Sequence, residues 1–290
     1  MKNFCTLLLI LLGYTTIHAQ TEDMLDLLGE DEPTIEYVKN AFKSSRVING
    51  HSMEMLAPGA MDFRILHRFG EVTGGAYEMF GLDQASMRMG FDFGITRNLT
   101  IGVGRSTFQK ELDGFIKYRI IQQSKGARIM PFSILYVTGM TGNGLKFEDT
   151  TRENYFSSRL SFYHQLIIGR KFNDNFTLQV SPTVVHRNLV ETAADPNDLY
   201  ALGIGGRVKL TQRLALTTDY YYVFNRVDSS TYNPLSIGID IETGGHVFQL
   251  HFSNTVGMNE RAFISDTQAQ WAEGEVRFGF NLSRMFQIVK

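Results

Sequence analysis

Residues 250–254 (Leu-His-Phe-Ser-Asn) hold the residue types in this chain that come nearest to a catalytic pair. In a β-strand, side chains two positions apart share a face, so His251 and Ser253 would point the same way. An imidazole beside a hydroxyl can act as a general base and make the oxygen nucleophilic. The sequence identifies no acidic residue that would orient the imidazole. His251 and Ser253 are therefore catalytic candidates, and the alternative is a polar pair without catalytic function.

The spacing of this pair resembles the His-x-Ser-Asn signature of outer-membrane phospholipases and lipid A deacylases, over four residues. That resemblance implies a lipid-acting hydrolase. Those enzymes present the pair toward lipid, whereas the alternation around His251 turns both side chains to the opposite face. The flanking residues 255–257 do not extend the match.

A second group of polar residues consists of charges that fall on one face of alternating segments. An unpaired buried charge costs several kcal/mol, so a dry core could not hold many of them. They either line an aqueous lumen or pair with one another, and because both signs are mixed no ion selectivity follows. We predict that twelve of them face the lumen: Arg88, Asp92, Lys117, Arg119, Arg159, Arg207, Lys209, Asp219, Asp240, Glu242, Glu275 and Arg277.

The elements that must position these residues are strands of about ten residues, each followed by a turn. In residues 86–95, Met89 and Phe91 alternate with Arg88 and Asp92, which gives one apolar and one polar face. The pattern predicts strands at 61–69, 85–95, 98–108, 113–123, 127–140, 155–172, 175–189, 199–211, 213–226, 236–243, 246–257 and 271–284. The predicted fold class is all-β, a closed antiparallel transmembrane β-barrel of about 12 strands with a short N-terminal helical segment.

Short turns at 96–98, 124–126, 173–175, 211–213 and 243–245 alternate with long polar links at 70–84, 141–154, 190–198, 227–235 and 258–270. In outer-membrane barrels the short turns are periplasmic and the long loops extracellular. Barrels of about 8 strands are filled by side chains and those of 16–18 leave an aqueous channel, so about 12 strands favours a narrow pore.

Four residues fit the predicted strands poorly. Pro131 and Pro182 fall within strands, where proline cannot donate to the ladder, and this favours bulges. His164 and His186 fall on the predicted lipid face, His164 near the middle of the membrane. A shifted register or a bulge would turn them inward, and the sequence leaves both possibilities open.

The N-terminal 60 residues differ from the rest. Residues 1–19 combine Lys2 with an apolar run at 7–12, which predicts a secretory signal peptide cleaved after about Ala19. Residues 20–60 are predicted to form a periplasmic N-terminal segment, followed by the barrel at 61–290. Apolar residues at helical spacing over 35–42 favour a short helix, and an alternative position for this segment is the barrel mouth.

Composition excludes several classes of function. The single cysteine, Cys5, lies in the predicted signal peptide, which excludes disulfides and thiol chemistry in the processed chain. A net charge of −2 gives no indication of a nucleic-acid partner. The histidines are scattered without the short paired spacing of a zinc site, so we expect no metal and no cofactor. The expected partners are outer-membrane lipid and small solutes in the lumen, and no partner protein is indicated.

Residues 45–52, running into 62–70, are similar to a family of β-barrel outer-membrane proteins from Gram-negative bacteria of the Bacteroidota kind, a domain of unknown function. Residues 245–252 and 277–281 resemble it too. The resemblance covers most of the processed chain and implies the fold and the location. It brings no activity and no catalytic residue.

These observations favour a narrow channel or transport pore in the outer membrane. A lipid-acting hydrolase built on His251 and Ser253 is one alternative. A structural or docking barrel that presents its long loops or its acidic N-terminal segment to a partner is the other.

Overall fold

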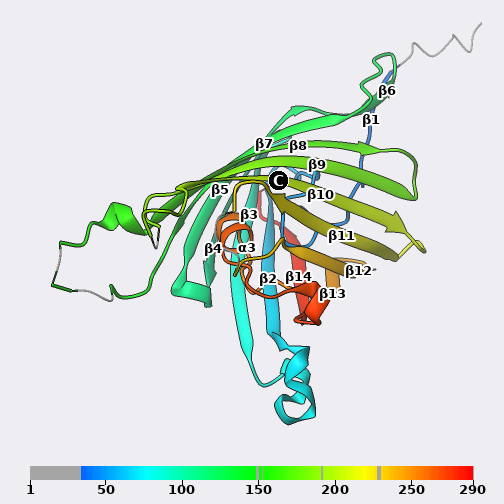
Figure 1. The fold of residues 1–290 in the computed structure, drawn as a ribbon. Helices are drawn as coiled ribbons and strands as arrows, with labels where there is room; N and C mark the ends of the chain where they lie inside the picture. Colours follow the sequence, from blue (N-terminus) through cyan, green and yellow to red (C-terminus); the bar gives the residue numbers. More distant parts are fainter. Residues whose placement is uncertain (1–33, 148–149, 152, 191, 227–229, 290) are drawn as a thin grey trace, which may run out of the picture. The chain divides into compact units, whose positions relative to one another are not determined.

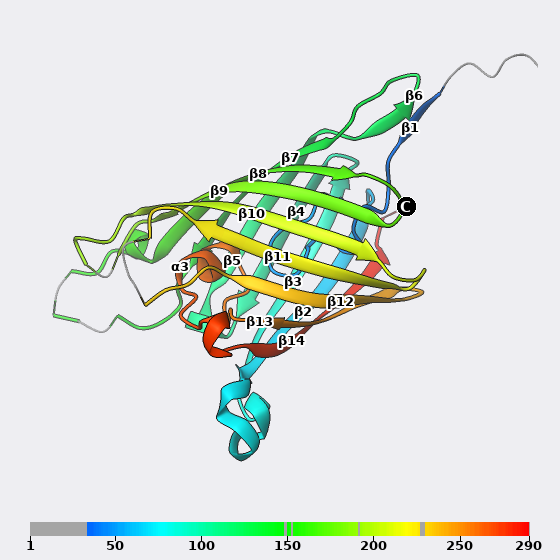
Figure 2. The ribbon, with the colours of Figure 1, turned by 45° about the vertical axis from the view of Figure 1, so that its right-hand side comes forward.

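In the computed structural model, twelve antiparallel strands close into a barrel (Figures 1 and 2). The structure describes residues 34–147, 150–151, 153–190, 192–226 and 230–289. The predicted signal peptide and residues 20–33 of the predicted N-terminal segment, which include its acidic residues, lie outside these residues. The barrel strands are β2 (Ala60–Glu71), β3 (Ala85–Thr96), β4 (Leu99–Ser106), β5 (Leu112–Ile121), β7 (Ser133–Gly142), β8 (Leu160–Lys171), β9 (Phe176–Arg187), β10 (Asp198–Lys209), β11 (Leu214–Val223), β12 (Leu235–Thr243), β13 (His246–Ser253) and β14 (Arg277–Gln287).

Each barrel strand pairs with the barrel strands before and after it in the chain, and β14 pairs with β2 to close the ring. The predicted closed barrel of 12 strands is confirmed. A separate small unit holds β1 (Ile35–Tyr37), which pairs antiparallel with β6 (Ser124–Gly126). Residues 124–126, predicted as a tight turn, are therefore a short strand.

Alternation along the strands explains why the barrel forms. In β3, Met89 and Phe91 are 43% and 41% exposed on the outer surface, whereas Arg88 and Asp92 are 1% and 2% exposed inside. The same alternation in the other barrel strands gives an apolar outer surface. The inner surface is polar over much of the barrel, while β7 turns Leu135 and Val137 inward. In the part of the chain that the structure describes, no helix has the length and hydropathy needed to cross a membrane.

The two prolines predicted within strands do not shift the register of the strands around them. Pro131 precedes β7, and Pro182 lies on the outer side of β9, where the pairing with β8 continues from Gln165↔Thr183 to Ile168↔Val180. His164 does face outward. Its Nδ1 atom lies 2.7 Å from the Tyr136 hydroxyl and 3.1 Å from that of Thr138, so the neighbouring strand β7 supplies hydrogen-bond partners for this nitrogen.

The links between strands alternate in length as predicted, apart from the brief link at 107–111, but the link at 122–132, predicted to be a short turn, is long and contains β6. The other long links and the link at 107–111 lie at one end of the barrel, which we call the long-link end, and the short turns at the other (Figure 2). The last link contains α3 (Glu260–Ser265) and folds inward, so β14 begins at Arg277 rather than at residue 271. Figures 1 and 2 show α3, in orange, within the ring of strands.

The interior is filled by a segment that the sequence placed elsewhere. Residues 41–56, here called the lumen segment, are mostly buried inside the barrel. Ala41, Phe42 and Val47 share an apolar cluster with Tyr163 on β8 and Phe263 on α3. These residues are therefore not periplasmic, as was predicted. They lie inside the barrel, which is closer to the alternative position at the barrel mouth.

The expected helix over 35–42 is wrong as well. Residues 35–37 form strand β1, and residues 41–45 follow bends. The main-chain amides of Ala41 and Phe42 donate to the Glu54 carboxylate, which satisfies this backbone without a helical ladder.

Candidate functional site: a closed lumen beneath a polar vestibule

Side chains of the barrel hold the backbone of the lumen segment. The Asp219 carboxylate on β11 accepts hydrogen bonds from the main-chain amides of Asn49, at 2.9 Å, and Gly50, at 2.8 Å. Gln249 on β13 donates to the Val47 carbonyl at 2.6 Å, and Asn281 on β14 donates to the Ile48 carbonyl at 2.9 Å. Several strands therefore satisfy an irregular buried backbone that makes no continuous ladder with them.

A buried ion pair joins the lumen segment to α3. Arg46 Nη1 lies 2.9 Å from Glu260 Oε1, and each side chain is 1% exposed. Arg46 also donates to the Asn49 carbonyl at 2.6 Å. Removing one partner of such a pair leaves an uncompensated charge in the interior. The two segments that fill the barrel, one from each end, are therefore bound to each other.

The predicted lumen charges divide into two groups. The buried ones serve the lumen segment or pair across strands. Lys117 donates to the Glu54 carbonyl at 2.6 Å, Asp92 accepts from Ser45, and Arg88 pairs with Asp113. Buried inside are Arg88, Asp92, Lys117, Arg207, Asp219 and Asp240; only partly buried are Arg119, Arg159, Lys209, Glu242, Glu275 and Arg277.

Several buried charges lie outside the set that the sequence predicts to face the lumen. Asp62, Arg64 and Arg68 follow the same alternation on β2, which would have placed them inside. Arg64 donates to the hydroxyl of Ser44 at 3.1 Å and to that of Ser45 at 2.6 Å. Glu260 is another buried charge that was not predicted. A local sequence signal marks the start of its helix, because Asn259 is a typical N-cap residue and accepts a hydrogen bond from the Ala262 amide at 2.9 Å.

His251 and Ser253 both face the interior. The Ser253 hydroxyl lies 2.7 Å from that of Ser236 and 3.0 Å from that of Thr255, and His251 Nδ1 contacts the Gln249 carbonyl at 3.3 Å. Within the described residues, no hydrogen bond joins the imidazole to the Ser253 hydroxyl. Both residues are at most 1% exposed, so lipid has no access to them.

The scattered histidines do not converge. Among the described residues, no three His, Cys, Asp or Glu side chains form a group that could hold a metal ion.

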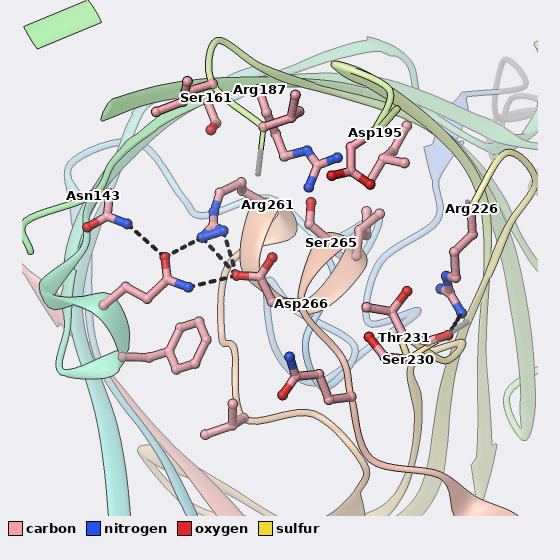
Figure 3. Close-up of a pocket in the computed structure, with 18 of the residues that line it drawn as sticks. Asn143, Ser161, Arg187, Asp195, Arg226, Ser230, Thr231, Arg261, Ser265 and Asp266 are labelled. Carbon is pink, nitrogen blue, oxygen red and sulfur yellow. Dashed lines mark hydrogen bonds and ion pairs between the residues drawn. The ribbon is translucent and has the colours of Figure 1, made fainter. Parts of the chain in front are cut away.

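A cavity of about 890 Å³, here called the vestibule, opens at the long-link end (Figure 3). Its walls come from several links. Arg261, Ile264 and Ser265 of α3 line it, together with Asp266, which follows the helix. Five arginines and two aspartates are among its described lining residues. These are Arg159, Arg187, Arg226, Arg261, Arg277, Asp195 and Asp266.

Arg261 organises one side of the vestibule. Its guanidinium lies 3.0 Å from the Glu111 carboxylate and 2.6 Å from that of Asp266, and it also donates to Gln109 at 2.6 Å. Burial raises the pKa of Glu111, and Arg261 opposes that rise. Burial by itself would lower the pKa of Arg261, but the two carboxylates raise it.

The fold, its apolar outer surface and its family match define a membrane-bound β-barrel. The chain belongs to the family described as "Membrane bound beta barrel domain (DUF5777)", whose model matches residues 42–286. The matched region runs from the lumen segment to β14, and the resemblance to a barrel family of unknown function is confirmed. No curated protein sequence matches the chain.

Similar folds occur among solved structures. The NanC porin has a TM-score of 0.49 at 6% identity, over 78% of this chain and 98% of that chain. The KdgM porin has a TM-score of 0.47 at 8% identity, over 78% and 99%. An active-site mutant of outer membrane phospholipase A from Escherichia coli has a TM-score of 0.43 at 13% identity, over 83% and 96%. At these identities the likeness concerns the fold, and no activity follows from it.

Proposed function

We propose that this protein is an outer-membrane channel with a narrow pore that its own lumen segment closes. In this proposal, residues 1–19 direct export and are removed after about Ala19. The apolar outer surface and the alternation of short turns with long links support an outer-membrane location.

The way in which the lumen segment is anchored carries the proposal. Main-chain groups of Val47, Ile48, Asn49 and Gly50 bond to barrel side chains, while the barrel strands bond to one another. The segment can therefore leave without breaking the strand ladders that close the ring. A typical hydrogen bond contributes about 0.5–1.5 kcal/mol net. Many such bonds and the Arg46–Glu260 ion pair hold the segment, so the closed state should predominate and opening should be rare.

The polar interior fits this proposal. If the lumen segment leaves, the inner faces of β3, β5 and β11 would expose Asp92, Lys117 and Asp219 to water. Charged walls favour an aqueous path through the pore. The ring of paired strands would remain intact. The buried, inward-facing His251 and Ser253 do not support the lipid-acting hydrolase.

Recordings in planar lipid bilayers test the channel. We expect wild-type protein to conduct rarely and Asp219→Ala to open often, because this substitution removes the acceptor for two buried amides. Asp174→Ala, in an exposed turn, is the matched control. Heat-dependent gel mobility verifies that each barrel is folded. Folded proteins that stay silent in all three forms, or a wild type as open as Asp219→Ala, would overturn the proposal.

A further inference from the structure

We propose that the lumen segment is a hairpin that withdraws toward the short-turn end of the barrel, while α3 stays in place at the long-link end. The inference rests on the proposed channel and names the part that moves when the pore opens. It assigns control of the pore to the side of the short turns, which is the periplasmic side in the proposed function.

The lumen segment is bonded to itself as a hairpin. The amide at the start of its turn, residues 47–50, donates to the carbonyl at the end of the turn at 2.9 Å. Arg46 and His51 form an antiparallel bridge next to this turn. One position further along, the Ser52 amide donates to the Ser45 carbonyl at 3.0 Å. These bonds satisfy part of the backbone within the segment, so it can move as one body without first unfolding.

Both ends of the lumen segment are fixed at the short-turn end of the barrel. Before it, the Val38 amide donates to the Gln123 carbonyl at 2.9 Å, two positions after β5 ends. After it, the Gly59 amide donates to the Gly94 carbonyl at 2.8 Å, near the end of β3. The Gly59 carbonyl accepts from the Ile288 amide at 2.9 Å, directly after β14. The lumen segment therefore enters and leaves the barrel by the same opening.

The turn of the lumen segment reaches far toward the long-link end. Asn49 donates to the Ser236 hydroxyl at 2.8 Å, near the start of β12, and to that of Thr255 at 3.3 Å, beyond the end of β13. By contrast, the Met53 amide donates to Gln179 at 2.9 Å, near the short-turn end of β9. The contacts of the lumen segment are thus ordered along the barrel, as expected for a hairpin inserted from the short-turn end.

Each base of the hairpin carries a residue with a left-handed backbone. Asn40 has a φ of 56° and Gly59 a φ of 72°. Gly and Asn adopt this conformation with less strain than other residues. At Gly59 an added Cβ atom would also lie 2.2 Å from the Val289 carbonyl oxygen. A few residues at the ends of an element commonly absorb the rotation of a hinge, so these two positions are suited to let the lumen segment swing out.

The last link is held to the barrel by bonds that do not involve the lumen segment. Asn259 donates to the Glu111 carboxylate at 2.6 Å, and the Arg261 guanidinium lies 3.0 Å from the same carboxylate. Further along, the Tyr232 amide donates to the Thr267 carbonyl at 2.7 Å. These anchors persist when the lumen segment leaves, so α3 would narrow the long-link end of the open pore.

Withdrawal separates the one ion pair described above between these two parts. Arg46 would leave with the lumen segment into water, and Glu260 would stay on α3 beside a water-filled lumen. Both charges then become solvated. Neither is left unpaired in a dry interior, which is the arrangement that makes a broken buried pair costly.

Two reducible cross-links test the direction of movement in bilayer recordings of the Asp219→Ala protein. The first joins Lys43→Cys to Glu242→Cys, whose wild-type side chains pair at the short-turn end and are partly exposed. The second joins Gln109→Cys to Asp266→Cys, whose wild-type side chains meet at 2.9 Å at the long-link end. A short bismaleimide with an internal disulfide forms each link in the folded full-length chain. The same variant before cross-linking, and again after reduction, is its own control.

We expect the first link to abolish openings, because it fastens the lumen segment to β12, and reduction to restore them. The second link should leave the open probability unchanged, because α3 does not move. Loss of openings with the second link overturns the inference, and so do openings that persist with the first. Heat-dependent gel mobility verifies that each barrel is folded. A folded Asp219→Ala protein that never conducts before cross-linking refutes the channel itself, which distinguishes that failure from a wrong direction of movement.

Discussion

The substitution Gly50→Ala tests directly whether close packing of the lumen segment against the barrel wall keeps the pore closed. A Cβ atom built on Gly50 would lie 1.9 Å from the Tyr221 hydroxyl oxygen and 2.9 Å from the ring carbon that bears it. Real Cβ atoms essentially never approach other heavy atoms closer than 3.0 Å. Gly50 cannot simply slide away, because its amide donates to Asp219 at 2.8 Å.

The expected magnitude follows from the cost of overpacking. An extra methyl group in a well-packed interior costs about 1–3 kcal/mol, and a shift of this size changes a two-state equilibrium by about 5- to 150-fold. The strain falls on the closed state alone, since the contact exists only while the segment is seated. We therefore expect the open probability of Gly50→Ala to rise by a factor in that range.

Single-channel recording measures this change, and two further variants make it specific. Gly245→Ala adds the same methyl group where nothing lies within 4 Å, so it should behave like wild type. Tyr221→Phe removes the hydroxyl that meets the new methyl group. The double variant Gly50→Ala/Tyr221→Phe should therefore return part of the way to the closed state, because the ring carbon at 2.9 Å remains. The reasoning would be refuted if the open probability of Gly50→Ala were no higher than that of Gly245→Ala, or if adding Tyr221→Phe did not lower it.

Two further predictions concern the interior ion pair and the outer surface. Glu260→Gln leaves Arg46 buried without its partner charge and should lower the free energy of unfolding by about 3–5 kcal/mol in urea titrations from lipid vesicles. Exposed Glu273→Gln should leave the urea midpoint unchanged, and equal midpoints for both variants would contradict the account. Ile204→Arg, on the outer side of β10, should cost about 2–4 kcal/mol near the middle of the membrane, whereas Gln212→Arg in the adjoining turn should cost little. An Ile204→Arg barrel as stable in vesicles as wild type would contradict an outer surface in contact with lipid.

Sequence patterns predicted the barrel well because alternation is a local property with a strong physical cause. Met89 and Arg88 point to opposite faces in any strand, and the surroundings then decide which face meets lipid. The same rule gave the inward direction of Arg88, Lys117 and Asp219. It also placed His164 on the outer face, where Tyr136 and Thr138 supply hydrogen bonds from a neighbouring strand.

The closed lumen could not be predicted in the same way. The lumen segment has no repeating pattern, because its backbone bonds to side chains from strands far away in sequence, such as Asp219 and Asn281. The pairing of Arg46 with Glu260 joins residues 214 positions apart. The inward fold of the last link depends on the same long-range contacts. The pattern therefore assigns residues 254–257 and 271–276 to strands and only 258–270 to a loop, whereas all of them lie in the link.

Thiol labelling of a Ser52→Cys variant tests most directly whether the lumen segment fills the barrel. Ser52 is fully buried, and the processed chain is expected to carry no other cysteine. In outer-membrane vesicles we predict that a membrane-impermeant maleimide leaves this thiol unlabelled. Heat unfolding, or added Gly50→Ala, should expose it, and Thr211→Cys in an exposed turn should react at once in vesicles opened at both faces. Labelling of Ser52→Cys in the native protein as fast as that of Thr211→Cys would contradict the closed lumen.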